Sequence, residues 1–166
     1  MRAVSLSMIF ISLLLGAAIF GFFYAWVCST MWGLDAADPA VAIAAMQAMN
    51  ASVRNIVFFP AFFLTPVAMA ATSALLFRAQ RGPAMAFGLA AIVYLIGGLA
   101  LTMSINVPMN EALARITLTD NPATAATIWR NYSDPWQFWN QIRTVASGAA
   151  FLLAAYGTFL IDRRAL

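Results

Sequence analysis

Four long apolar stretches constrain this chain more than any other feature of its sequence. They are Val4–Cys28, Ile56–Phe77, Ala84–Ile105 and Val145–Ile161. Each is roughly 17–25 residues long, the length that an α-helix needs to cross the hydrocarbon core of a bilayer. Only 9% of the residues are charged, against about a quarter in an average soluble domain. The 166 residues therefore predict one all-α domain, residues 1–166, folded as an integral membrane four-helix bundle.

The arginines predict how this bundle is oriented. There is no lysine, and arginines occur near the N-terminus, in the second connection and at the C-terminus: Arg2, Arg78, Arg81, Arg163 and Arg164. Four crossings place these three regions on one side, and the positive-inside rule makes that side the cytoplasm. We therefore expect a bacterial cytoplasmic membrane protein with both termini inside. The first and third connections, about 29–55 and 106–144, then lie outside.

Both outer connections carry signals of helix starts. A capping side chain precedes a proline at Asp38-Pro39, Asn121-Pro122 and Asp134-Pro135. The cap accepts backbone N–H bonds, and proline at the first helical position loses no bond that it would have made. A helix from Pro39 to Phe77 would be about 58 Å long at 1.5 Å per residue. It should therefore stand clear of the bilayer or break, with Pro60 and Pro66 as the expected kinks.

Polar side chains form stripes at the outer end of three of the four predicted crossings. These residues are Gln47, Asn50 and Arg54; Asn106, Asn110 and Glu111; and Trp136, Asn140, Arg143 and Ser147. Polar groups near hydrocarbon turn toward each other or toward water, so we expect one inward-facing cluster. Arg143 should contact a carboxylate or several carbonyl oxygens, and Glu111, the only glutamate, is the nearest candidate by depth.

A purely structural interpretation of these residues stays open. The amides can cap helix ends and pin one helix to another, and Trp129, Tyr132, Trp136 and Trp139 can form an interfacial aromatic belt. Glu111 with Arg54 or Arg143 fits either a structural ion pair or a proton acceptor in a ligand pocket.

The composition excludes several classes of site. Histidine is absent, Cys28 is the only cysteine, and the six acidic residues are scattered. A structural zinc site needs several His or Cys ligands, and a dithiol relay needs two cysteines. We therefore expect no metal and no cofactor. No basic patch with interleaved aromatic residues is present, so we expect no nucleic-acid partner.

Three segments resemble a known family. "AIAAMQAMN" (42–50), "NVPMNEAL" (106–113) and "WNQIRTVAS" (139–147) are similar to motifs of the anthrone oxygenase-like family of small four-helix membrane proteins. The similarity covers roughly residues 12–160. It implies oxidation of anthrones to anthraquinones without metal or flavin, with Asn50, Asn106, Asn110, Trp139, Asn140 and Arg143 at the site. Many relatives carry histidine after the Trp-Asn pair, where this chain has Gln141, so Glu111 would have to act as the base.

Two functions remain open at this point. The first is a membrane protein that binds a lipid-, quinone- or aromatic-type ligand, or accompanies a membrane complex or a second copy of itself, without catalysis. The second is a cofactor-independent anthrone- or quinol-type oxygenase with Glu111 as base and Arg54 and Arg143 stabilising the enolate. In both, the ligand-binding residues would be Gln47, Asn50, Asn106, Asn110, Trp136, Trp139 and Asn140. Transport is a third possibility, and it would require several copies of the chain.

Overall fold

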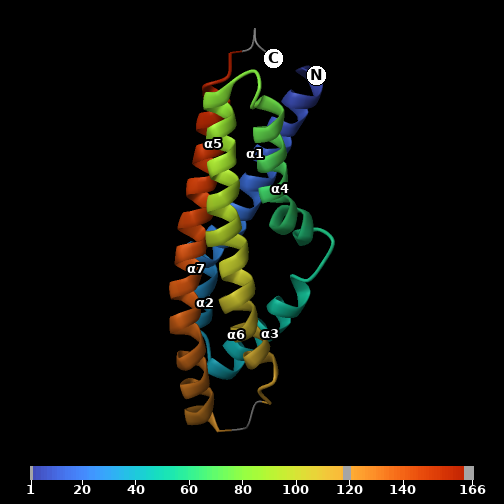
Figure 1. Cartoon of the computed structure of the whole chain (residues 1–166). Coiled ribbons are helices and arrows are strands. Elements are labelled where there is room, and N and C mark those ends of the chain that lie inside the picture. The colour runs from blue at the N-terminus through green and yellow to red at the C-terminus, as the bar shows by residue number, and fades with distance from the viewer. Residues whose placement is uncertain (1, 118–120, 163–166) are drawn as a thin grey trace.

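The computed structural model describes residues 2–117 and 121–162, and these residues form helices and no strands. The four crossings run antiparallel (Figure 1). The first is α1 (Arg2–Ala25), continued by a π-helical turn, η1 (Trp26–Thr30), and by α2 (Met31–Asp35). The second is α3 (Pro39–Ser52) followed by α4 (Phe58–Leu76). The third is α5 (Arg81–Tyr94), η2 (Leu95–Ala100), η3 (Thr102–Asn106) and α6 (Val107–Ala114), and the fourth is α7 (Pro122–Phe159).

The predicted all-α four-helix membrane architecture is confirmed. Within residues 2–117 and 121–162, four helices are long and apolar enough to cross a membrane: Ala3–Asp35, Phe58–Leu76, Arg81–Ala114 and Pro122–Phe159. Their outer faces carry large exposed apolar side chains, such as Phe10, Leu89 and Leu152, which suit contact with lipid. The chain has the helices of an integral membrane protein.

The length of α4 indicates where the hydrocarbon core ends. Its 19 residues span about 29 Å, which is one hydrocarbon thickness. The described ends of the chain and the α4–α5 connection lie at one end of the bundle (Figure 1). We call the opposite end the distal end. There, α2, α3, α6 and the first turns of α7 extend past the level at which α4 begins. Arg163 and Arg164 lie outside the described residues, and the orientation relative to the cytoplasm remains a prediction.

Two of the three predicted helix caps are confirmed. Asp38 accepts hydrogen bonds from the N–H groups of Ala40 and Val41, and Asn121 accepts them from Ala123 and Thr124. The cap predicted at Asp134-Pro135 is wrong, because α7 continues through Pro135 without a break. Buried residues on both sides of the proline, Trp129, Tyr132 and Trp136, share one helix face, and their packing compensates for the lost hydrogen bond.

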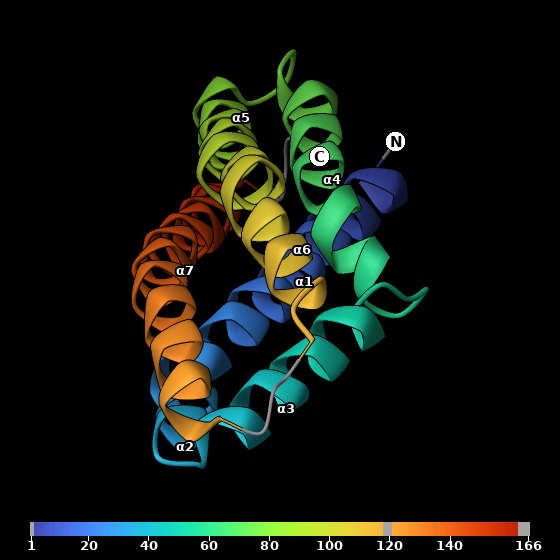
Figure 2. The ribbon, with the colours of Figure 1, turned by 90° about the horizontal axis from the view of Figure 1, so that it is seen from below.

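The second crossing breaks, but not at the predicted prolines. The break is the turn 53–57 between α3 and α4, which bulges from the bundle (Figure 1). Asn55 makes the turn, because its side-chain oxygen accepts hydrogen bonds from the N–H groups of Val57 and Phe58. Pro60 falls in the first turn of α4, where its missing N–H costs nothing, and Pro66 stays inside the helix. Seen from the distal end, α3 crosses from the neighbourhood of α2 and α7 toward α4 (Figure 2).

The interior divides into two apolar cores. One lies among the crossings and contains Phe23, Phe62, Met69 and Tyr94; the other lies at the distal end and contains Ile43, Met46, Trp129 and Trp136. Inside the first core, Ser12 and Thr72 share a 2.9 Å hydrogen bond between α1 and α4. Some of the polar residues predicted from the sequence, among them Asn110 and Arg143, lie between residues of these two cores.

Candidate functional site

A pocket of about 300 Å³ lies where the two cores meet. We call it the central pocket, and it is lined by residues of α1, η1, α3, the turn 53–57, α4, η3, α6 and α7. Eight of its eighteen lining residues are aromatic: Phe22, Phe23, Trp26, Phe58, Phe59, Phe62, Phe63 and Trp136. Phe59 and Phe63 are also exposed on the outside of the bundle, so this wall separates the pocket from the lipid. The pocket thus sits at the first turns of α4, near the edge of the hydrocarbon core.

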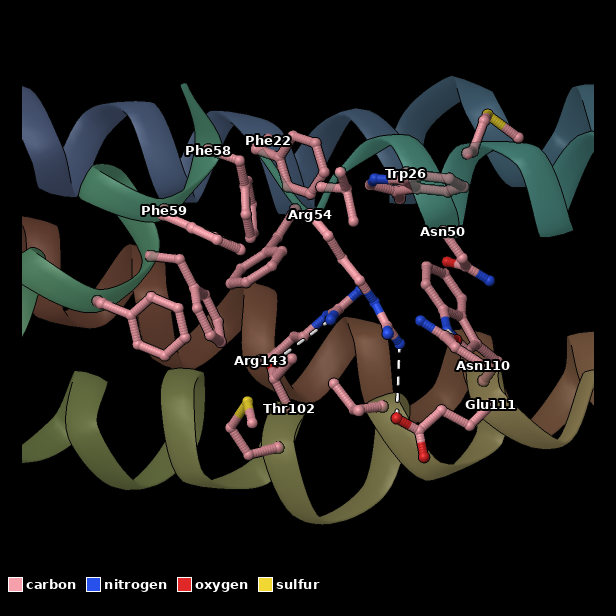
Figure 3. A pocket seen from close by; sticks show the side chains of 18 residues that line it. Phe22, Trp26, Asn50, Arg54, Phe58, Phe59, Thr102, Asn110, Glu111 and Arg143 are labelled. Carbon is pink, nitrogen blue, oxygen red and sulfur yellow. Dashed lines mark hydrogen bonds and ion pairs between the residues drawn. The ribbon is translucent and has the colours of Figure 1, made fainter. Parts of the chain in front are cut away.

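The polar lining of the pocket is small and carries charge. It consists of Asn50, Arg54, Thr102, Asn110, Glu111 and Arg143. Figure 3 shows Arg54, Glu111 and Arg143 reaching toward the same space from three separate parts of the chain. The site therefore combines aromatic walls with two guanidinium groups and one carboxylate.

Arg143 is buried, and no carboxylate of the described residues pairs with it. Its side chain is on α7, and the residue is 5% exposed. Its Nε donates to Asn140 Oδ1 at 2.8 Å, and one terminal nitrogen donates to Thr102 Oγ1 at 3.4 Å. Its guanidinium carbon lies 4.3 Å from the ring centre of Phe23 and 4.9 Å from that of Trp136. Aromatic faces and neutral oxygens therefore surround this charge, an arrangement that stabilises a cation only in part.

The contact expected between Arg143 and Glu111 is wrong. Glu111 pairs with Arg54, whose Nη2 lies 3.5 Å from Glu111 Oε1. Arg143 meets the third crossing at Thr102, more than two helical turns before Glu111. Arg54 lies in the turn between α3 and α4, from which its long side chain reaches the carboxylate.

Asn110 organises the distal side of the pocket. Its Oδ1 accepts hydrogen bonds from the Tyr132 hydroxyl and from Trp136 Nε1, both at 2.8 Å. Asn50 Nδ2 donates to the same Tyr132 hydroxyl at 3.3 Å. The Asn110 side chain of α6 thereby holds two aromatic side chains of α7. Asn50 connects α3 to the same group through the Tyr132 hydroxyl.

Four predicted site residues do not line the central pocket. Gln47 donates to the carbonyl oxygens of Leu113 and Ile116 and so fastens α3 to the end of α6. Asn140 lies behind Arg143 and donates at 3.4 Å to the Phe23 carbonyl. Asn106 is 0% exposed, and neither polar atom of its side chain has a hydrogen-bond partner among the described residues. Trp139 packs edge-on against Phe138. The polar residues thus form separate groups rather than the single cluster expected.

The sequence interpretation missed the aromatic walls. Phe22, Phe23 and Trp26 come from the first crossing, to which it assigned no site residue, and Phe58 and Phe62 come from the second. These side chains looked like ordinary membrane-spanning residues. The available signal was the density of rings in "FGFFYAW" (20–26) and "FFPAFF" (58–63), at equal depth in antiparallel crossings.

A comparison with models of known protein families shows the family to which the chain belongs. The family model described as anthrone oxygenase matches residues 54–153, well over half of the chain. This chain belongs to the anthrone oxygenase family. The match begins at Arg54 and includes Asn110, Glu111, Trp136 and Arg143. Phe22, Trp26 and Asn50, which also line the pocket, lie outside the matched residues. Among curated proteins and solved structures, no chain matches this one.

Proposed function

We propose that the central pocket binds a flat, oxygen-bearing aromatic molecule that reaches it from the membrane. The observation that carries this proposal is one cavity whose walls are aromatic rings and whose polar lining includes the buried guanidinium of Arg143. Ring faces and edges favour offset or edge-to-face contact with another ring, and a cation favours a carbonyl or hydroxyl oxygen. A lipid-like partner lacks the flat shape that such walls complement.

The size and position of the cavity support this choice. About 300 Å³ is at the lower end of the range for small-molecule sites, roughly 300–1,000 Å³, and suits a fused-ring compound. Phe59 and Phe63 line the pocket and also face outward beside the turn 53–57. A hydrophobic ligand dissolved in the bilayer can therefore enter when these side chains move, without passing through water.

The test is a binding titration of purified protein in uncharged detergent with anthraquinone, followed by quenching of tryptophan fluorescence. Trp26 and Trp136 line the pocket and lie 5.2 Å apart, ring centre to ring centre, so a bound ring quenches both. Val107→Phe fills the pocket and should weaken binding about tenfold or more, since added bulk must displace ligand contacts. Val145→Phe, on the exposed face of α7, is the matched control and should bind as the parent does. Equal affinity of both variants would reject the pocket as the binding site.

A second candidate function is cofactor-independent oxygenation of an anthrone. The observation that favours it, beside the family membership, is that Glu111 lines the same cavity as two guanidinium groups. Glu111 would remove a proton from the anthrone methylene, and Arg54 and Arg143 would stabilise the enolate oxygen. The carbanion would reduce O₂ by one electron, and the radical pair would combine into a carbon-bound peroxide. Loss of water then leaves the second carbonyl, so one anthrone and one O₂ give one anthraquinone and one water.

Oxygen uptake tests this second candidate. The parent protein should consume one O₂ for each anthraquinone formed, and Glu111→Gln should slow uptake by about 10²-fold or more, the usual size of a general-base contribution. Asp134→Asn, an exposed carboxylate on α7 outside the pocket, is the control. Unchanged uptake in Glu111→Gln would remove Glu111 as the base.

A further inference from the structure

We propose that the central pocket selects the ionised form of its aromatic ligand, a phenolate or enolate, over the neutral ring. The inference rests on the proposed binding function and goes further by naming the charge state of the ligand.

The charges around the pocket do not balance. Among the described residues that line it, Arg54 and Glu111 form an ion pair with each other. Arg143 is the remaining charge, and its hydrogen-bond partners, Asn140 and Thr102, are neutral. The central pocket therefore carries one uncompensated positive charge.

The other titratable groups near Arg143 do not supply the missing anion. Tyr94 and Tyr132 are the tyrosines that interact with it electrostatically. The Tyr94 hydroxyl donates to the Phe62 carbonyl at 2.9 Å, and the Tyr132 hydroxyl donates to Asn110. Both phenol protons are held by an acceptor, so both side chains are neutral donors.

Because Arg143 is buried, the absence of an anionic partner for its guanidinium is costly in free energy. A guanidinium removed from water loses its hydration, and the two aromatic faces and two neutral oxygens around Arg143 restore only part of that stabilisation. The hydrogen bonds use Nε and one terminal nitrogen, whereas a guanidinium has five N–H donors. The remaining donors are available to an oxygen atom in the cavity. A ligand oxyanion would supply both the missing charge and the missing acceptor.

The pocket walls decide which organic anion fits. A fatty acid carries the same charge on a flexible chain, but the rings of Phe23, Phe58 and Trp136 offer flat contacts to a fused-ring anion. A ring with an ionised hydroxyl places its oxygen against Arg143 while its faces meet these walls. We therefore assign the site to aromatic oxyanions.

The experiment uses two dyes that differ by one ionisable group, 2-hydroxyanthraquinone and unsubstituted anthraquinone. The hydroxyl dye absorbs at longer wavelength when ionised, so its colour reports its charge independently of turnover. At a pH where the free dye in detergent is neutral, binding to the parent protein should produce the spectrum of the anion. The hydroxyl dye should also bind about tenfold or more tightly than anthraquinone, as expected for a buried charge contact.

Three variants separate charge from folding. Arg143→Met should abolish the colour change and the preference for the hydroxyl dye, and Arg143→Lys should keep part of both. Glu111→Gln removes a negative charge from the pocket and should strengthen binding of the anion several-fold, a gain that misfolding does not produce. Arg130→Met, an exposed arginine on α7, is the control and should match the parent.

If both dyes bind equally and the hydroxyl dye stays neutral, the charge selection is wrong and the proposed binding function stands. If neither dye binds, the proposed function itself fails. Two competitors of the hydroxyl dye compare ligand shapes: dodecanoate, a fatty-acid anion, and alizarin, a hydroxylated anthraquinone. Dodecanoate should compete at least about tenfold more weakly than alizarin. Equal competition would overturn the assignment to aromatic anions.

Discussion

Arg54 and Glu111 face each other across the central pocket, with 3.5 Å between Arg54 Nη2 and Glu111 Oε1. Both side chains are about half exposed, at 56% and 47%. An exposed pair contributes about 0.2–1 kcal/mol, because water screens the charges and two long side chains must be ordered. The ion pair therefore contributes little to stability, and its two side chains can separate when a ligand enters the pocket.

A double-mutant cycle tests this pairing. Arg54→Gln and Glu111→Gln should show a coupling of about 1 kcal/mol or less in the free energy of unfolding in detergent. Arg143→Met and Glu111→Gln should instead add within about 0.5 kcal/mol, because these residues share no contact. A coupling of several kcal/mol between Arg143 and Glu111 would mean that the carboxylate belongs to the buried arginine.

Removing the amide of Asn110 should destabilise the distal end. Asn110→Leu leaves the Tyr132 hydroxyl and Trp136 Nε1 without their acceptor, and each stranded donor costs about 1–3 kcal/mol. We expect a loss of about 2–4 kcal/mol in the free energy of unfolding. Asn131→Leu, an exposed amide on α7, should change it by less than about 0.5 kcal/mol. Similar losses in the two variants would argue against the role of Asn110.

Asp35 should hold the end of α2 against α7. One carboxylate oxygen accepts from Trp129 Nε1 at 2.9 Å and Ser133 Oγ at 2.7 Å, and the other accepts from Gln137 Nε2 at 2.8 Å. Asp35→Ala should cost about 2–4 kcal/mol and speed amide hydrogen exchange in α2 and the first turns of α7. Exchange in α4 and α5 should be unaffected, and Asp134→Ala should leave both regions unchanged. Uniformly faster exchange across the bundle would contradict a local fastening role.

Cysteine labelling checks the orientation predicted by the arginines. In a Cys28→Ser background, an impermeant thiol reagent added outside intact cells should label Ala36→Cys and not Ala79→Cys. Ala36 and Ala79 are both exposed, so accessibility alone does not separate them. Ala36 belongs to the connection between α2 and α3, at the distal end, and Ala79 to the connection between α4 and α5, at the opposite end (Figure 1). Labelling of Ala79→Cys and not Ala36→Cys would reverse the orientation.

Helix existence could be predicted from the sequence, because it follows from apolar length and local capping. The stretches around the four crossings and the caps at Asp38 and Asn121 are local signals, and both were confirmed. Asp134-Pro135 carries the same local signal and fails, because buried residues packed on both sides of it keep α7 continuous. The prolines indicated kinks within α4, whereas the break lies before α4, where the Asn55 side chain accepts hydrogen bonds from the N–H groups of Val57 and Phe58.

The candidate site was predicted less completely, because a pocket depends on pairing between distant helices. Periodicity placed Asn50, Arg54, Asn110, Glu111 and Arg143 on inward faces, and these residues line the pocket. Periodicity could not predict which residue pairs with which. It indicates the helix face on which a polar side chain lies, but not the level along the bundle at which that side chain meets another helix. Two π-helical segments, η2 and η3, shift the register of the third crossing and set Thr102 opposite Arg143.

Photo-crosslinking measures the central claim most directly, namely that a flat aromatic molecule binds in the central pocket. Purified protein is irradiated with an anthraquinone that carries a diazirine, and the labelled residues are identified by mass spectrometry. The account predicts labels on pocket residues such as Phe22, Met103 and Val107, and loss of these labels when unlabelled anthraquinone is added. Labels confined to lipid-facing residues such as Leu14 and Leu152, unaffected by the competitor, would contradict it.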